Sequence, residues 1–334
     1  MIGPRVLPTA ALVGVAALVA SPVAIALRMM TNQNQSASGS KKAAAGKAAV
    51  LAGFDGERAY KYLVEQCQIG PRISGTEGNR KLRRRLAEHF ESCGAKIQLQ
   101  QFEVRHPLTR EPVQMENVVA SWNPQRKRRV LVGAHFDTRP HPDRETDPRK
   151  KAAPFLGAND GASGVAVLME LANLMPELRT TAGVDFVCFD GEELVFGEDR
   201  GEYFLGSIHF AELYRQGRSE GRYAGAIVID MIGDKSLQIY PDQVSQQEAQ
   251  QLVREVWDIA KRLGATGFKS GRGHDIRDDH LALLDVGIPA IDLIDFDYGP
   301  DNRYWHTTED TSDKCSAASL AQVGGVLAEW LRGR

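Results

Sequence analysis

The sequence has few cysteines and almost no net charge. Its 334 residues include four cysteines, with no C-x-x-C pair and no Cys/His spacing typical of a zinc finger. This argues against a structural zinc site and against a dense disulfide scaffold. Lysine and arginine number 41 against 43 aspartate and glutamate, for a net charge of −2. Without an excess of positive charge, no nucleic acid is expected as a partner.

Two of the four cysteines leave the question of a disulfide open. Cys67 and Cys93 each end a helix-like segment, and a bridge between them is one alternative, because spacing alone does not decide connectivity. Cys188 lies in the apolar run 184–189, which predicts a small buried core residue.

A long uncharged apolar run lies at the N-terminus. Residues 6–27, bounded by Arg5 and Arg28, are long enough to cross a bilayer, which favours an uncleaved anchor. Ala24-Ile25-Ala26, however, resembles the cleavage site of a signal peptide. Residues 1–30 are therefore predicted to be a signal peptide or a transmembrane anchor. Both alternatives predict an extracytoplasmic protein, either secreted or periplasmic, or membrane-anchored by residues 6–27.

A polar tether is predicted after this segment. Residues 31–53 are rich in Asn, Gln, Ser, Gly, Ala and Lys, a composition that provides no hydrophobic core. The folded domain is predicted to span residues 54–334.

Within that domain, apolar runs typical of strands alternate with helical patterns. Strands are predicted at 97–104, 117–122, 130–136, 184–189, 226–231 and 290–294, and helices at 78–92, 163–174, 206–214, 245–263, 279–286 and 316–330. No internal repeat is visible. The alternation predicts a single α/β domain with a mixed, largely parallel central sheet flanked by helices on both faces.

Histidine and carboxylate side chains follow several of the predicted strands. They are His135, Asp137, Asp190, Glu192, Glu193 and Asp230, with His306 after the last strand. In sheets of this kind, ligands bind at the carboxyl ends of the strands. The sequence therefore gathers acidic and imidazole groups at one edge of the predicted sheet.

This inventory matches what a catalytic zinc site needs. Such a site takes three protein ligands from Asp, Glu and His and leaves one position open, and a further carboxylate is needed to move protons. His135 has Asp137 close enough in sequence to orient its ring. The chemistry is concentrated in six ordered segments: GAHFD at 133–137, GANDGASG at 157–164, DGEE at 190–193, IDM at 229–231, RDDH at 277–280 and YWHT at 304–307.

Through these segments, the region from about 70 to 330 resembles the zinc aminopeptidase superfamily and, within it, the glutaminyl cyclases. The resemblance implies that Asp160, Glu193 and His306 hold one Zn²⁺ and that Glu192 is the general acid/base. It implies a zinc-dependent glutaminyl-peptide cyclotransferase, which converts the N-terminal glutamine of a peptide or protein to pyroglutamate and releases ammonia. A membrane would be contacted only through the N-terminal segment, if that segment is not cleaved.

The two-zinc aminopeptidases of the same superfamily are the alternative. In them the Asp160 position bridges both metals, and the positions of His135 and Asp230 bind the second zinc. All five ligand positions are present here, so removal of N-terminal residues with two zinc ions stays open.

Two features favour the cyclase. Asp278 completes the DDH segment of the cyclases, in which this acid faces the Asp230 position and shares the catalytic work. Trp305 directly precedes His306, as in the cyclase Trp-His-Thr, where the indole lines the pocket for the substrate glutamine.

Two features depart from the animal cyclases. Arg277 stands where those enzymes carry Gln before DDH. The long loop 138–154, rich in proline and charge, looks more like bacterial members and is expected either to form a rim over the site or to be a mobile surface insertion.

Overall fold

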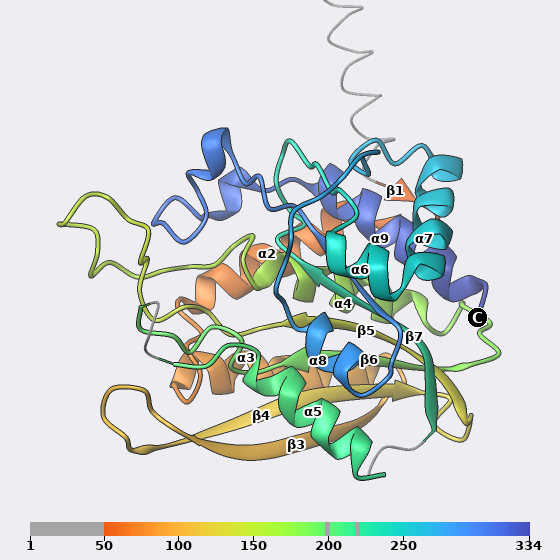
Figure 1. Cartoon of the computed structure of the whole chain (residues 1–334), viewed down its shortest axis with the longest axis horizontal. Helices are drawn as coiled ribbons and strands as arrows, with labels where there is room; N and C mark the ends of the chain where they lie inside the picture. Colours follow the sequence, from red (N-terminus) through yellow and green to blue (C-terminus); the bar gives the residue numbers. More distant parts are fainter. Residues whose placement is uncertain (1–49, 198–200, 218–220) are drawn as a thin grey trace, which may run out of the picture. The chain divides into compact units, whose positions relative to one another are not determined.

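The computed structural model describes residues 50–197, 201–217 and 221–334 (Figure 1). Its centre is a six-stranded sheet of order β3-β4-β6-β5-β7-β8. The strands are β3 (Lys96–Arg105), β4 (Pro112–Trp122), β5 (Arg128–His135), β6 (Gly183–Phe189), β7 (Arg222–Asp230) and β8 (Ala290–Ile294). β6, β5, β7 and β8 are parallel to one another, whereas β4 is antiparallel to both β3 and β6. The mixed, largely parallel sheet predicted from the sequence is confirmed.

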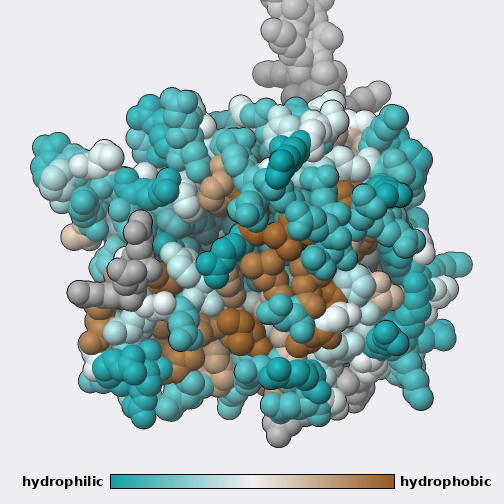
Figure 2. All heavy atoms as spheres, viewed as in Figure 1, coloured by the Kyte–Doolittle hydropathy of each residue, from teal (hydrophilic) through white to brown (hydrophobic). Residues whose placement is uncertain are grey.

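Helices cover the two faces of the sheet unequally (Figure 1). One face packs against α2 (Gly56–Ile69), α3 (Glu77–Ser92), α4 (Ala162–Leu174), α7 (Gln250–Leu263) and α9 (Ala317–Arg332). The other packs against α5 (Leu205–Arg215) and α8 (His280–Asp285). Figure 2 shows apolar side chains gathered over this second face, where Ile208 of α5 is exposed.

Alternation along the strands builds these two cores. Val118 and Ala120 of β4 join the larger core, and Val119 between them joins the smaller one. Because successive side chains of a strand point to opposite faces, a strand covered on both faces is buried along its length and mostly apolar. β6 and β8 are accordingly buried at every position.

Helix α4 runs through the larger core, and its first eleven residues are all buried. It begins after Gly161, whose backbone has a positive φ of 93°. A Cβ there would lie 2.7 Å from the carbonyl oxygen of Asp137 and 3.1 Å from Cε1 of His135. Glycine therefore allows the turn that carries Asp160 to pass close to the end of β5.

The structure corrects two predicted boundaries. The predicted helix 245–263 is divided into α6 (Gln243–Glu248) and α7 at Ala249, whose φ of −136° is not helical. The hydroxyl of Ser245 in α6 accepts the N–H of Asp292, which ties α6 to β8, while α7 packs on α9. Residues 50–53, assigned to the tether, form a hairpin of β1 (Val50–Leu51) with β2 (Phe54–Asp55).

The structure tests the predictions for the cysteines but not the prediction for the apolar N-terminal run. The apolar run 6–27 lies outside the described residues, and no described helix has the length and hydrophobicity to cross a membrane. Cys67 and Cys93 are both free thiols, so the disulfide alternative is wrong for this structure. Cys188 is a buried core residue of β6, as predicted.

Candidate active site and metal centre

The predicted site residues meet at the carboxyl ends of the parallel strands. His135 is the last residue of β5, Asp230 is the last residue of β7, and Glu192 and Glu193 follow β6 after a two-residue turn. A cavity of about 530 Å³ opens at this edge of the sheet. Its lining includes Asp160, Glu192, Glu193, Asp230, Asp278, Trp305 and His306.

Asp160, Glu193 and His306 form the first of two ligand clusters. Nε2 of His306 lies 3.4 Å from an oxygen of Asp160 and 3.4 Å from Oε1 of Glu193. One donor atom from each residue lies within 4.8 Å of the others, and all three residues are buried. These are the three residues predicted as zinc ligands, and the fold brings them together.

The second ring nitrogen of His306 contacts a residue that was not predicted to belong to the site. Its Nδ1 lies 3.1 Å from Oδ1 of Asp143, in the loop 138–154. Burial alone would lower the pKa of His306, but the facing carboxylates of Glu193, Asp143 and Asp160 outweigh it and raise the pKa well above its ordinary value. A carboxylate on the second ring nitrogen fixes the orientation and tautomer of a metal-binding imidazole.

Arg139 connects the loop to the other side of the same cluster. Its side chain is buried, donates a hydrogen bond to Oε1 of Glu193 and lies 3.0 Å from Oδ2 of Asp143. A further N–H bonds the hydroxyl of Tyr203 at 2.9 Å. The guanidinium therefore offsets the charge of the buried Glu193 and of Asp143 and fixes their positions.

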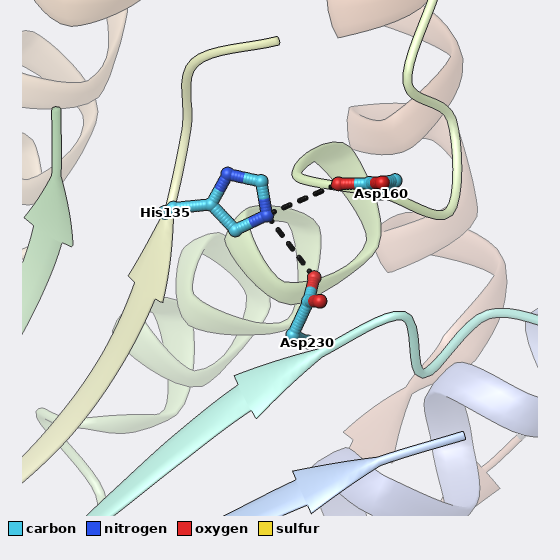
Figure 3. Close-up of side chains that lie close together, drawn as sticks. All are labelled: His135, Asp160 and Asp230. Carbon is cyan, nitrogen blue, oxygen red and sulfur yellow. Dashed lines mark hydrogen bonds and ion pairs between the residues drawn. The ribbon is translucent and has the colours of Figure 1, made fainter. Parts of the chain in front are cut away.

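His135, Asp160 and Asp230 form the second cluster (Figure 3). Nε2 of His135 lies 3.3 Å from Oδ1 of Asp160 and 3.1 Å from Oδ1 of Asp230. Asp160 thus faces both histidines, and their hydrogen bonds lower its pKa far below the ordinary value although burial opposes this. The arrangement fits a bridging position between two clusters.

Asp137 has a different main contact from the one predicted. Its Oδ1 lies 3.6 Å from Nδ1 of His135, longer than a hydrogen bond. The carboxylate instead accepts the backbone N–H of Glu192 at 3.1 Å and of Glu193 at 3.0 Å. Asp137 therefore holds the turn that carries the glutamate pair, and it orients the His135 ring only weakly.

Asp310 holds the turn that carries Asp160, as Asp137 holds the turn of the glutamate pair. Asp310 was not predicted to belong to the site either. Its carboxylate accepts the N–H of Asn159 at 2.8 Å, the N–H of Asp160 at 3.1 Å and the hydroxyl of Tyr298 at 2.8 Å. Burial, assisted by the charge of Asp160, raises the pKa of Asp310 to about 7. The only sequence signal is its place four residues after His306.

Two carboxyl groups beside the clusters, those of Glu192 and Asp278, have raised pKa values and can carry protons. Burial, followed by the charge of Glu193, raises the pKa of Glu192 well above the ordinary value. Burial and the charges of Asp279 and Asp230 do the same for Asp278. Oδ1 of Asp278 accepts the N–H of Asp279 at 2.6 Å, whereas its buried Oδ2 has no hydrogen-bond partner among the described residues. The cavity can therefore accept a proton or an ammonium group.

Trp305 forms part of the cavity wall next to the first cluster. Its ring centroid lies 4.1 Å from that of His306 and 4.8 Å from that of Phe296. His306 has a left-handed backbone with φ of 55°, a conformation that is strained for a residue with a side chain. The strained turn places imidazole and indole side by side in the cavity.

The first cluster fits a zinc ion. Two carboxylates and an imidazole are ligands that zinc takes, and three ligands leave a position for a substrate. Oε2 of Glu193 is buried without a hydrogen-bond partner among the described residues, so an acceptor is available where a cation would satisfy it.

Comparisons with known proteins agree with this geometry. The family model for peptidase family M28 matches residues 117–331. The glutaminyl cyclase of Fimbriiglobus ruber is 42% identical with a TM-score of 0.81, covering 84% of this chain and 96% of that one. A leucine aminopeptidase precursor of Bacteroides thetaiotaomicron is 31% identical with a TM-score of 0.78, covering 84% and 98%. The glutaminyl-peptide cyclotransferase-like protein of Bos taurus is 24% identical over 284 residues, 78% of this chain and 71% of that protein.

The chain belongs to peptidase family M28, in the zinc aminopeptidase-like superfamily. Its similarity to several bacterial glutaminyl cyclases confirms the resemblance predicted from the six segments. The chain is therefore an enzyme of the glutaminyl cyclase and M28 type.

Proposed function

We propose that this enzyme is a zinc-dependent glutaminyl-peptide cyclotransferase that converts N-terminal glutamine to pyroglutamate. The observation that carries the proposal is the buried Asp278, which lines the same cavity as Asp230 and Glu192. A second metal at Asp230 needs that carboxylate ionised and free. An adjacent acid with a raised pKa instead favours a shared proton or a bound amine at this position.

Zinc would be held by Asp160, Glu193 and His306, and when bound it supplies a Lewis acid for the γ-carboxamide of the substrate. Asp143 and Arg139 keep the imidazole and the glutamate in place, as their contacts indicate. Because these contacts fix the two side chains, the ligands need little reorganisation when the metal enters.

Glu192 is the proton carrier. The substrate's α-amine attacks its own γ-carbon, so one C–N bond forms and the bond to the departing amide nitrogen breaks. Glu192 takes the proton that the amine loses and gives it to the departing nitrogen, which leaves as ammonia. A raised pKa suits a carboxyl that must accept and return a proton in one cycle.

Asp230 and Asp278 hold the substrate's α-amine. Both line the cavity, and together they present carboxylate oxygens to a cationic or neutral amine. Trp305 packs against the folded-back glutamine side chain. Holding the amine next to the folded-back amide favours the intramolecular attack, because the reacting atoms are brought into contact before the barrier is crossed.

Product analysis combined with metal counting tests the proposal. The purified full chain is incubated with a peptide that starts with glutamine, and the products are weighed by mass spectrometry. Cyclisation gives a product that has lost one ammonia, and elemental analysis gives one zinc per chain. Loss of the whole first residue, from glutamine and leucine peptides alike, contradicts the proposal.

The aminopeptidase is the second candidate, because the His135, Asp160 and Asp230 cluster is also complete. In that reaction Glu192 would take a proton from the attacking water instead of from an amine. Two zinc ions per chain in the same elemental analysis would favour it.

We also propose that the enzyme acts outside the cytoplasm, because residues 6–27 are apolar enough for export or anchoring. Cell fractionation of the full chain tests this. Recovery in the cytoplasmic fraction alone contradicts it.

A further inference from the structure

Two exposed arginines line the mouth of the cavity whose floor is acidic. Arg144 belongs to the loop 138–154, and Arg277 directly precedes Asp278. Within the described part of the chain, neither guanidinium lies within 4.0 Å of a carboxylate, although Asp275 lines the same mouth. This differs from Arg139 in the same cavity, whose charge is engaged by Glu193 and Asp143.

The position of Arg144 is fixed by the residues on either side of it. Asp143 faces the imidazole of His306, and the carboxylate of Glu145 accepts the N–H of Thr308 at 3.2 Å and its hydroxyl at 2.6 Å. Between them, the N–H of Arg144 donates to the carbonyl of His306 at 3.2 Å. Three consecutive residues of the loop are therefore bound to the turn that carries the zinc-ligand candidate, so this part of the loop is a rim rather than a free insertion.

The side chain of Arg144 lies over the indole of Trp305, with its Cζ atom 4.0 Å from the ring centroid. A guanidinium stacked on an aromatic face keeps the N–H groups along its edge available to other acceptors. Arg277 is anchored differently, because its neighbours Ile276 and Asp278 are buried while its own side chain is exposed. The guanidinium of Arg144 is thus held on Trp305, and the backbone of Arg277 is fixed by its buried neighbours, so that both arginines have N–H groups available at the mouth.

A bound peptide must pass these two arginines. With the glutamine side chain against Trp305 and the amine at Asp230 and Asp278, the rest of the substrate leaves through the mouth. We propose that Arg144 and Arg277 select substrates with a carboxylate close behind the N-terminal glutamine. The carboxylate comes from an acidic second residue or from the free C-terminus of a very short peptide. This inference rests on the proposed function and adds a substrate class to it.

Matched peptides test the inference on the full chain loaded with zinc. The first pair is Gln-Glu and Gln-Gln, each followed by the same neutral residues and a C-terminal amide. The third peptide is a Gln-Gln dipeptide with a free carboxylate, compared with its amide. We expect kcat/KM to be about five- to tenfold higher with the carboxylate, chiefly through KM, because two exposed ion pairs contribute effects of this size. The preference should shrink as salt is raised.

Substitutions assign the preference to the two arginines. Arg277→Gln places here the residue of the animal cyclases, and Arg144→Gln keeps a polar side chain next to Trp305. Each substitution is expected to lower the ratio of kcat/KM between the acidic and the neutral peptide. In the double variant this ratio should be near one. Arg149→Gln is the matched control, because Arg149 is an exposed arginine of the same loop that is paired with Asp147.

A binding measurement separates this inference from the proposed reaction. Dissociation constants for the same peptides are measured by calorimetry on the Glu192→Gln variant, in which turnover is expected to be much slower than binding. Equal affinity for carboxylate and neutral peptides, or a preference that survives in the double arginine variant, overturns the inference. If affinities differ as expected but no peptide loses ammonia in the unsubstituted enzyme, the inference stands and the proposed reaction fails. The two peptide pairs show which carboxylate is recognised.

Discussion

The two ligand clusters share Asp160 and contain the same kinds of donor, yet their surroundings differ. In the cluster with Glu193, the second nitrogen of His306 lies 3.1 Å from Asp143, and Arg139 binds the glutamate. In the cluster with Asp230, the second nitrogen of His135 has no hydrogen-bond partner among the described residues.

The difference teaches that a ligand set is not yet a metal site. Contacts behind the ligands fix their orientation and raise the affinity for the metal. The cluster with Glu193 has such contacts, whereas the cluster with Asp230 has additional carboxyl groups beside it. We therefore expect a resident zinc at the first cluster and proton or amine chemistry at the second.

The first prediction compares the two histidines. His306→Ala is expected to lose the bound zinc and with it the activity, because it removes one of three ligands. His135→Ala is expected to retain one zinc per chain. Elemental analysis of both variants measures this, and a fall from two zincs to one in His135→Ala would make the second cluster a metal site as well.

Glu192 lies 4.0 Å from Nδ1 of His135 and is predicted to move the proton. Glu192→Gln should lower kcat by about 10²–10⁴-fold, the usual contribution of a general acid/base. Its zinc content should not change, because Glu192 is not a proposed ligand. Ammonia release and elemental analysis are measured on the same preparation, and undiminished turnover contradicts the assigned role.

Asp278→Asn tests the acids of the second cluster. It should lower cyclisation by roughly 10²-fold, because the amine and its proton lose one of their two carboxylates. An unchanged rate of cyclisation would contradict the role assigned to Asp278. The variant keeps the size of the side chain, so circular dichroism should show an intact fold.

Asp143→Asn weakens the support of the first cluster without removing a ligand. Zinc affinity is expected to fall by about 10- to 100-fold, which is typical for loss of a carboxylate behind a metal-binding histidine. Competition with a chelator measures it. Asp147→Asn is the control, because Asp147 belongs to the same loop and, among the described residues, forms an ion pair only with exposed Arg149. Equal affinities in both variants would show that the loop does not support the metal.

The stability of the metal-free protein should depend on pH. Burial raises the pKa of Asp190, Asp279 and Asp310 to about 7, so the folded chain binds more protons than the unfolded chain between about pH 4 and 7. The free energy of unfolding should therefore fall as the pH rises through 7. Thermal melts from pH 5 to pH 8 measure this.

Added zinc should make the free energy of unfolding fall less steeply with pH, because metal binding favours deprotonated ligands. A melting temperature that rises with pH in the absence of metal contradicts the prediction.

Much of the fold was predictable from local pattern. β8 was predicted with the bounds it has, because four of its five buried residues are apolar. The division of 245–263 at Ala249 was not predictable, because it depends on the contact of Ser245 with Asp292, which lies 47 residues away. The local hydrophobic pattern of a segment does not show a contact with a residue so distant in the sequence.

The same division applies to the site. Each proposed ligand stands in a segment with a recognisable pattern at a strand or helix end. Asp143 and Asp310 do not, because an isolated aspartate in a polar loop looks like any turn former. Only the fold shows that these two carboxylates lie against His306 and the Asp160 turn.

The sequence by itself determined the sheet, the family and the ligand inventory, because these depend on residue type and order along the chain. The tertiary structure decided which cluster is supported, what Asp137 holds and how the loop 138–154 is bound. Those properties depend on distances between residues far apart in sequence and on burial, which together set the pKa of each carboxyl.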